Sequence, residues 1–294
     1  MKYLISGATG FIGCNLIKKL LNDGNNVIAI ARCNSNISDE MRALTEDNIF
    51  IFDNNIDQLD EFLDRHKPDI FIHLAALYIT QHSKNDVERL ITANITYPAI
   101  LFESVIRSGC NKIINTGTSW QSFNNISNNP ASLYSATKEA IESILNFYVS
   151  SAKASAITLR LFDTYGPNDN RKKLISMLVE SFSTNSQVEM SEGEQEIDLV
   201  YIDDVLNAYL IAAEILKNSK PYKHMIYGIS SNNPITLKEL VEIINATLNK
   251  KPNIAWGVKP YREREVMKTW KSFERLPGWE PKIGLKEGLK TLLR

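Results

Sequence analysis

Apolar residues along the first half of the chain follow two alternating patterns. Short runs that are apolar throughout predict strands, and they lie at 2–6, 26–31, 48–53, 69–75, 111–116 and 155–161. Stretches in which apolar residues recur every three or four positions predict helices, and they lie near 11–22, 57–66, 84–107 and 133–152. Strands without polar alternation suit a parallel sheet that is covered on both faces. The predicted fold class is therefore α/β, with a doubly wound parallel sheet.

A glycine-rich segment, Gly7-Ala8-Thr9-Gly10-Phe11-Ile12-Gly13, lies between the first predicted strand and the first predicted helix. At this junction a doubly wound sheet holds a dinucleotide. Gly7 would allow a tight turn, Gly10 a close approach of the backbone to a pyrophosphate, and Gly13 close packing of the helix on the strand. The free N–H groups of the helix N-terminus favour phosphate there. The spacing is G-x-x-G-x-x-G, and its place in the chain predicts nucleotide binding.

The strand pattern loosens after Arg160, where Pro167-Asn168-Asp169-Asn170 marks a turn-rich break. Helices and short strands mix beyond this point. We therefore predict a dinucleotide-binding domain over 1–165 and a smaller α/β substrate lobe over 166–294, partly interleaved with the first domain. The Asn- and Ser-rich stretch 119–131 is interpreted as a loop, and its length of about a dozen residues suggests a function.

The composition is that of a globular protein and narrows the function classes. The 294 residues are 44% hydrophobic and 23% charged, with a formal net charge of −1. A general nucleic-acid binder would carry a basic excess. Neither an apolar run of membrane-spanning length nor a charged-then-apolar leader is evident, and the cysteines and histidines lack metal-ligand spacing. We predict a cytoplasmic protein with reduced thiols, without nucleic-acid or membrane partners and without a metal.

Tyr134 and Lys138 form a second constellation on the helix predicted from about Leu133. Their i, i+4 spacing places both side chains on one helix face. A tyrosine that moves a proton near neutral pH needs a pKa below its usual value of about 10. A nearby ammonium lowers the pKa because it stabilises the phenolate. The preceding strand ends near Thr118, and a hydroxyl at that end lies at the ligand crevice of an open α/β sheet.

These features, in this order, resemble the extended branch of the short-chain dehydrogenase/reductase family. Further similar segments extend the resemblance over essentially the whole chain: His73-Leu74-Ala75-Ala76, Arg160 to Pro167 (compare R-x-x-N-x-Y-G-P), Val200 to Val205, and Gly278-Trp279-Glu280-Pro281-Lys282. The resemblance implies a Rossmann domain, a nicotinamide cofactor, a nucleotide-sugar substrate and a homodimer. It also implies that Tyr134, Lys138 and Thr118 are catalytic, with Tyr134 giving a proton to the sugar C4 oxygen.

The resemblance further implies two sets of ligand-binding residues. The cofactor set comprises Gly7, Thr9, Gly10, Phe11, Ile12, Gly13, Arg32, Asp53, Asn54, Leu74, Ala75, Ala76, Asn94, Tyr134, Lys138 and Phe162. The substrate set comprises Tyr78, Thr118, Ser119, Trp120, Asp163, Lys173 and Arg262.

Two positions in the predicted substrate lobe depart from the family pattern. Asp163 replaces the usual Asn that touches the substrate phosphates, and Ile197 stands where many members carry an Arg. A carboxylate is poorly suited to an anion. The resemblance therefore leaves phosphate neutralisation to Arg262, with Lys173 or Arg171 as further candidates.

The end of the second predicted strand bears on the choice of cofactor. An NAD enzyme of this fold places an acid there, for the adenine ribose 2′-OH. Here the strand ends Ile30-Ala31-Arg32-Cys33-Asn34, without a carboxylate, and Arg32 is available for a 2′-phosphate. NADPH is therefore predicted rather than NAD.

The segments 114–119 and 262–267 are most similar to bacterial 4-ketoreductases that make CDP-paratose, CDP-abequose or dTDP-fucose. The leading hypothesis is NADPH-dependent reduction of a dTDP- or CDP-linked 4-keto-6-deoxyhexose, in surface-polysaccharide sugar biosynthesis. The alternative is a nucleotide-sugar 4-epimerase with tightly bound NAD. A dehydratase is disfavoured because Ser119-Trp120 stands in place of an Asp-Glu pair. A redox-sensing regulator would need a broken triad, whereas Thr118, Tyr134 and Lys138 are all present.

Overall fold

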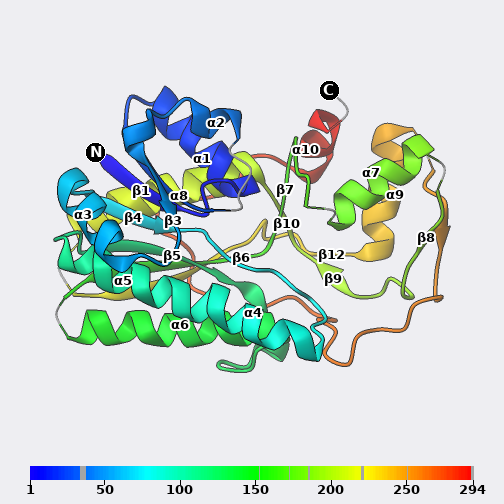
Figure 1. Cartoon of the computed structure of the whole chain (residues 1–294). Coiled ribbons are helices and arrows are strands. Elements are labelled where there is room, and N and C mark those ends of the chain that lie inside the picture. Colours follow the sequence, from blue (N-terminus) through cyan, green and yellow to red (C-terminus); the bar gives the residue numbers. More distant parts are fainter. Residues whose placement is uncertain are drawn as a thin grey trace.

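Seven parallel strands form the central sheet of the computed structural model, which describes residues 1–33, 38–151, 153–171, 173–184, 186–219, 222–249 and 251–292 (Figure 1). The order across the sheet is β3-β2-β1-β4-β5-β6-β11. The strands are β1 (Lys2–Ser6), β2 (Asn26–Arg32), β3 (Ile49–Phe52), β4 (Ile70–His73), β5 (Lys112–Thr118), β6 (Ser155–Leu161) and β11 (His224–Ile229). Chain order reverses between β1 and β4, and at such a switch point an open α/β sheet binds its ligand.

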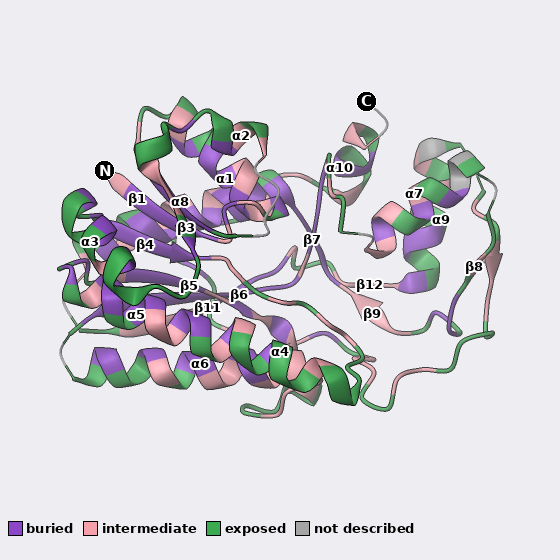
Figure 2. Ribbon diagram, viewed as in Figure 1, coloured by how far each residue is buried: buried purple, intermediate pink, exposed green. Residues whose placement is uncertain are grey.

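Helices cover both faces of this sheet, and each face has its own apolar core. One face carries α1 (Phe11–Asn22), α2 (Asp39–Arg42) and α8 (Ile202–Asn218). The other face carries α3 (Ile56–His66), α5 (Tyr97–Arg107) and α6 (Leu133–Ser150). Figure 2 shows the sheet as largely buried, and the outer helices as buried toward it and exposed away from it. The predicted α/β class and doubly wound sheet are confirmed, and the six predicted strands agree with β1–β6 to within about two residues.

The helix predicted over 84–107 is interrupted. A 3-10 turn (Lys84–Asp86) leads into α4 (Val87–Ile91), a π-helical segment (Thr92–Thr96) follows, and α5 continues the rod. Asn94 lies inside the π segment and is buried, with its side-chain amide bonded to the Leu77 backbone and to Thr137 Oγ1. Such π bulges are frequent at functional sites.

The chain after β6 builds a smaller layer beside the carboxyl ends of the strands (Figure 1). Three two-stranded ladders lie there: β7 (Asp163–Tyr165) with β10 (Leu199–Tyr201), β9 (Glu196–Ile197) with β12 (Ile235–Thr236), and β8 (Val188–Glu189) with β13 (Ile254–Ala255). The helices of this layer are α7 (Leu174–Thr184), α9 (Leu237–Leu248) and α10 (Leu285–Thr291). The chain returns to the main sheet between these pieces, through α8 and β11, so the lobe and the sheet share one apolar core.

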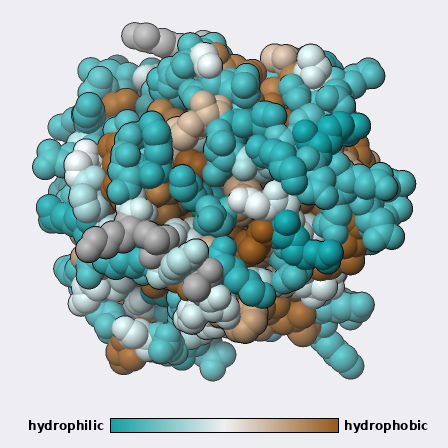
Figure 3. Space-filling view, turned by 90° about the vertical axis from the view of Figure 1, so that its left-hand side faces the viewer, coloured by the Kyte–Doolittle hydropathy of each residue, from teal (hydrophilic) through white to brown (hydrophobic). Residues whose placement is uncertain are grey.

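The end of the molecule away from this smaller layer is mainly hydrophilic, with hydrophobic residues scattered over it (Figure 3). Within the described part of the chain, no helix combines the length and the apolar character that a membrane crossing requires.

Candidate active site

The glycine-rich turn after β1 has the geometry that the sequence predicts. Gly7 adopts a φ of +72°, and a Cβ atom there would lie 2.5 Å from the backbone nitrogen of Ala75. A Cβ on Gly13 would collide with the carbonyl oxygen of Gly7, so the first turn of α1 rests directly on the glycine turn. Gly10 is the N-cap of α1 and contributes no side-chain cap. The first N–H groups of α1 are therefore open to a phosphate.

A cavity of about 810 Å³ opens over this turn, at the carboxyl ends of the strands β1 to β4. We call it the glycine-turn cavity. It is lined by nine of the predicted cofactor residues: Gly7, Thr9, Gly10, Arg32, Asp53, Asn54, Leu74, Ala75 and Ala76. The absence of a Cβ at Gly7 and the free end of α1 fit a dinucleotide whose pyrophosphate rests on the turn.

The other predicted cofactor residues lie outside this lining. Phe11, Ile12 and Gly13 form the first turn of α1 behind the glycine turn. Asn94 is committed to its contacts with Leu77 and Thr137. Phe162 lies in the wall of a second pocket, described below. Tyr134 and Lys138 lie on α6.

The N-terminal turns of α6 present Tyr134 and Lys138. The Ser132 side chain caps the helix by accepting from the Ser135 backbone N–H. Tyr134 meets Tyr78 edge to face, with 5.0 Å between ring centroids. Lys138 is 2% exposed, so its ammonium is almost wholly inside the protein.

The prediction that Lys138 lowers the pKa of Tyr134 is wrong for this structure. Burial raises the pKa of Tyr134 to about 12, and the cation that opposes this shift is Arg171. Burial also lowers the pKa of Lys138 to about 8, while Glu142 acts in the opposite direction. Desolvation disfavours the charged form of each group and outweighs the attraction expected from their helical spacing.

The Thr118 hydroxyl ends β5 and is held in a tight turn. Its Oγ1 accepts a hydrogen bond of 3.3 Å from the Trp120 backbone N–H. The Thr118 backbone N–H donates to Gln121 Oε1 at 2.9 Å. The hydroxyl proton of Thr118 is not used by the Trp120 bond, and it remains available to an acceptor.

A second pocket of about 370 Å³ lies between this turn and the smaller layer. We call it the aromatic pocket because rings form much of its wall: Tyr78, Trp120, Phe123, Phe162 and Trp270. Six of the seven predicted substrate residues line it: Tyr78, Ser119, Trp120, Asp163, Lys173 and Arg262. Thr118, the seventh, directly precedes Ser119. The structure therefore brings segments from residue 78 to residue 270 into one site.

The charged groups of the aromatic pocket are mostly stacked or paired. The Arg262 guanidinium lies 4.9 Å from the Trp120 ring centroid and forms a two-pronged ion pair with Glu265. Lys173 Nζ lies 5.2 Å from the Tyr78 ring centroid and 3.9 Å from Asp163 Oδ1. Burial lowers the pKa of Lys173, and Asp163 acts in the opposite direction. The pocket thus holds cations and carboxylates together, which suits a ligand with both phosphate and hydroxyl groups.

Sequence reasoning missed several lining residues. In the aromatic pocket these include Glu265, Asp198, Phe123 and Trp270. In the glycine-turn cavity they include Glu88, Arg89 and Tyr97. The signal that could have found Glu265 is its i+3 spacing from Arg262, which was already a candidate. The other positions carry no local pattern, because only the tertiary fold brings them to the site.

The comparisons with known proteins agree with this geometry. The family model described as "NAD dependent epimerase/dehydratase family" matches residues 3–228, which include the glycine turn, Thr118, Tyr134 and Lys138. The chain belongs to this family. The prediction of an extended short-chain dehydrogenase/reductase is confirmed at that level.

Relatives of several activities are similar over nearly the whole chain. A CDP-abequose synthase from Salmonella typhimurium is 29% identical, with 99% of this chain and 97% of that protein covered. A dTDP-4-dehydro-6-deoxyglucose reductase from Escherichia coli is 26% identical, with 99% and 96% covered. Among solved structures, a Thermotoga maritima UDP-glucose 4-epimerase with UDP-glucose has a TM-score of 0.85 at 24% identity, covering 100% of this chain and 97% of that one. The structural likeness supports the Rossmann-type fold.

Proposed function

We propose that the protein reduces the 4-keto group of a nucleotide-linked 4-keto-6-deoxyhexose with NADPH. Two whole-length relatives, the CDP-abequose synthase and the dTDP-4-dehydro-6-deoxyglucose reductase, support a modified nucleotide sugar as substrate. The observation that carries the proposal is Arg32. It is exposed at the end of β2 and lines the glycine-turn cavity at a position where an NAD enzyme would use an acid.

The proposed preference for NADPH favours a net reduction as the class of reaction. A guanidinium binds a ribose 2′-phosphate through charge-assisted hydrogen bonds, so Arg32 favours NADPH. An enzyme that draws on NADPH must release the oxidised cofactor after each turnover. A net reduction fits this requirement, whereas an epimerase returns its cofactor to the starting state within one catalytic cycle.

The chain supplies the proton chemistry and the orientation. A bound nicotinamide would supply the hydride for sugar C4. The Tyr134 hydroxyl donates its proton to the C4 oxygen, and the Thr118 hydroxyl donates a hydrogen bond to the same atom. Lys138 lies one helical turn from Tyr134 and would hold the nicotinamide ribose. A positioned general acid of this kind contributes typically 10²–10⁴-fold to the rate.

The protonation state of Tyr134 fits its proposed role as a proton donor. Because burial raises its pKa to about 12, the side chain keeps its proton at neutral pH. A ketone needs a proton donor as hydride arrives. An epimerase that begins from a hydroxyl sugar needs a phenolate instead. A tyrosine with the usual pKa of about 10 is also protonated at neutral pH, so the proton is available for reduction but does not by itself choose between the two reactions.

The departure at Asp163 is consistent with an unusual phosphate site. Lys173 lies beside Asp163 and compensates its charge. We expect Arg262 to bind the diphosphate by exchanging Glu265 for the ligand.

A homodimer is also proposed, through α4 and α6. Val87, Ile91 and Phe147 leave apolar surface exposed on these helices, whereas Ile141 and Leu145 are in the monomer core.

A 4-epimerase with tightly bound NAD is the second candidate, because a relative from Mycolicibacterium smegmatis, 26% identical over 72% of this chain, is a UDP-glucose 4-epimerase. The deciding experiment incubates the purified protein with 4-keto-6-deoxy sugars and, separately, with 4-hydroxy sugars linked to dTDP, CDP, UDP or GDP. The proposal predicts turnover of a ketone that requires added NADPH, with one NADP⁺ released per product. Conversion of a hydroxyl sugar into its C4 epimer without added reductant would establish the alternative.

A further inference from the structure

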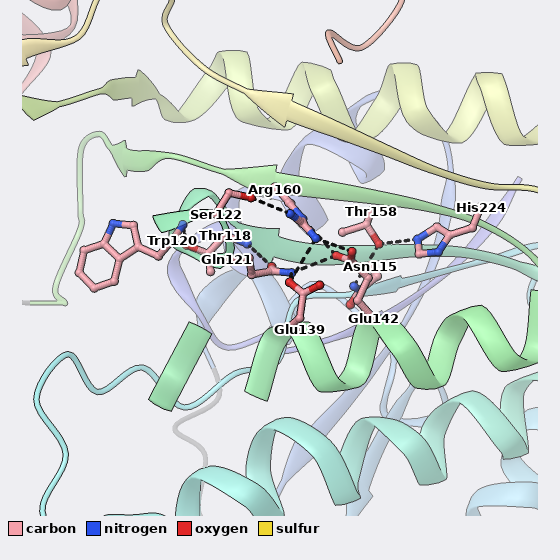
Figure 4. A network of polar contacts seen from close by, with 10 residues as sticks. All are labelled: Asn115, Thr118, Trp120, Gln121, Ser122, Glu139, Glu142, Thr158, Arg160 and His224. Carbon is pink, nitrogen blue, oxygen red and sulfur yellow. Dashed lines mark hydrogen bonds and ion pairs between the residues drawn. The ribbon is translucent and has the colours of Figure 1, made fainter. Parts of the chain in front are cut away.

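A buried polar cluster lies directly behind the Thr118 turn, between β5, β6 and α6 (Figure 4). Gln121 is at its centre and is 0% exposed. Its Oε1 accepts from the Thr118 backbone N–H at 2.9 Å. Its Nε2 donates to Glu139 Oε2 at 2.8 Å and to Glu142 Oε2 at 3.1 Å. One side chain therefore ties the end of β5 to two carboxylates of α6.

Arg160 of β6 holds these carboxylates in place. Its Nη2 lies 2.6 Å from Glu142 Oε1 and 3.3 Å from Glu139 Oε2. Its Nη1 donates to Ser122 Oγ at 3.2 Å. Both Arg160 and Glu142 are buried, at 7% and 4% exposed. The carboxylates accept from Arg160 and from Gln121, so a reversed amide of Gln121 would set its oxygen against them.

The space for this cluster is reserved by Gly117. A Cβ atom on Gly117 would lie 2.7 Å from Gln121 Oε1 and 2.8 Å from the Cγ of Arg160. Gly117 pairs with Arg160 in the register of β5 and β6. The strand that carries Thr118 therefore lacks a side chain at the point where the cluster meets it.

The cluster also reaches Lys138 and the aromatic pocket. Glu142 lies one helical turn beyond Lys138 and acts to raise its pKa against the effect of burial. Glu142 is thus paired with Arg160 and also acts on Lys138. The Arg160 guanidinium lies 5.5 Å from the ring centroid of Trp270, which lines the pocket.

We propose that Gln121 is a positioning residue that fixes the Thr118 hydroxyl relative to Tyr134, with the Arg160–Glu142 pair as its anchor. The inference rests on the proposed catalytic role of Thr118. Tyr134 and the two carboxylates belong to one helix, α6, whereas Thr118 ends a strand. The Gln121 amide is a direct link between them. A displacement of about 1 Å at a reacting group can cost about 10²-fold in rate.

A double-mutant cycle with Gln121→Met and Thr118→Val tests the proposal on whichever nucleotide sugar the protein converts. Met keeps the length of the side chain but cannot bond the Thr118 N–H or the carboxylates. In the wild-type background we expect Gln121→Met to lower kcat about tenfold or more, with the KM for the cofactor unchanged. In the Thr118→Val background it should have no further effect on kcat, because no hydroxyl remains to be positioned.

Two matched controls separate positioning from general loss of stability. Thr158→Val is nearly isosteric and removes two hydrogen bonds in the same layer, a buried one with Asn115 and a partly buried one with His224 (Figure 4). It should lower Tm but preserve kcat. Gln58→Met makes the same chemical change on the exposed face of α3 and should change neither.

The outcomes distinguish this inference from the proposed function. Equal losses of kcat from Gln121→Met in both backgrounds, or no loss in either, would overturn the positioning role while leaving Thr118 catalytic. An unchanged kcat in Thr118→Val alone would remove Thr118 from the mechanism and the inference with it. If Gln121→Met does not fold, Gln121→Asn replaces it in the cycle. Asn keeps an amide beside the carboxylates but is too short to reach the Thr118 N–H as well.

Discussion

The glycine-turn cavity and the aromatic pocket lie along the same edge of the sheet but are built in different ways. The cavity is lined by the glycine turn, by residues at the ends of four adjacent strands and by the helical segment at 88–97, all within residues 7–97. The pocket is lined by large side chains from segments between residues 78 and 270. Backbone geometry fixes the shape of the first site. Ring stacking and ion pairs, such as Trp120 with Arg262 and Arg262 with Glu265, fix the second.

This contrast indicates which residues of each site can be substituted. A glycine turn tolerates few substitutions, because a Cβ at Gly7 would overlap the backbone of the chain after β4. Side chains that stack over an open pocket can be exchanged without disturbing the sheet. Cofactor binding is therefore expected to be the constant property of this architecture. The sugar and its nucleotide are expected to be the variable ones.

The largest expected effect is on the proposed proton transfer from Tyr134. Tyr134→Phe keeps the ring that packs against Tyr78 and removes the hydroxyl. We expect kcat to fall by about 10²-fold or more, with the fold and cofactor affinity retained. Steady-state kinetics together with a cofactor titration measure this. Near-wild-type turnover would remove Tyr134 from the mechanism.

The next effect concerns the glycine-turn cavity alone. Arg32→Ala should weaken NADPH more than NADH, because only NADPH carries the 2′-phosphate. Hydrogen bonds to charged groups contribute roughly 1.5–3 kcal/mol, which corresponds to a change of about 10- to 150-fold in the affinity ratio. Arg65→Ala, an exposed arginine on α3, is the matched control. If both cofactors weaken equally, Arg32 does not select between them.

A smaller effect is expected for Arg262, the proposed phosphate-binding residue of the aromatic pocket. Arg262→Ala should raise the KM for the nucleotide sugar by roughly 5- to 30-fold, or about 1–2 kcal/mol, without changing the NADPH/NADH ratio. The effect is moderated because Arg262 must give up Glu265 to bind a phosphate. Arg264→Ala is the control: its guanidinium stacks on Phe123 and bonds Asn129 but does not line the pocket. Equal losses in the two variants would argue against a phosphate site at Arg262.

The smallest effect is a shift in pH dependence. The Lys138 ammonium is the active form, so kcat/KM should fall as pH rises through about 8, the pKa to which burial lowers this group. Glu142 acts to raise that pKa, and Glu142→Gln should therefore move the basic limb to lower pH. Profiles of kcat/KM between pH 6 and about 10, for the wild type and for Glu142→Gln, measure the direction in which the basic limb moves. A shift to higher pH would contradict the assignment of this limb to Lys138.

The sequence predicted features that depend on neighbouring residues. The turn at Gly7 and the shared helix face of Tyr134 and Lys138 follow from local spacing, and the apolar runs predicted β1–β6. The π segment around Asn94 was not predictable, because it depends on a hydrogen bond to Leu77, 17 residues away. Trp270 was not predictable as a site residue either, since tertiary folding alone brings it to Arg160, whereas the i+3 spacing of Glu265 from Arg262 is a local signal. The raised pKa of Tyr134 depends on burial, which spacing does not report.

The account's central claim is that a hydride from NADPH reaches sugar C4 in a net reduction. The most direct measurement uses NADPH deuterated at the transferable nicotinamide position with the 4-keto nucleotide sugar that the protein converts, followed by mass spectrometry and NMR of the product. The account predicts one deuterium per product molecule, located at C4, in step with the loss of NADPH absorbance. A product that carries no label at C4, or one that forms without consumption of NADPH, would contradict it.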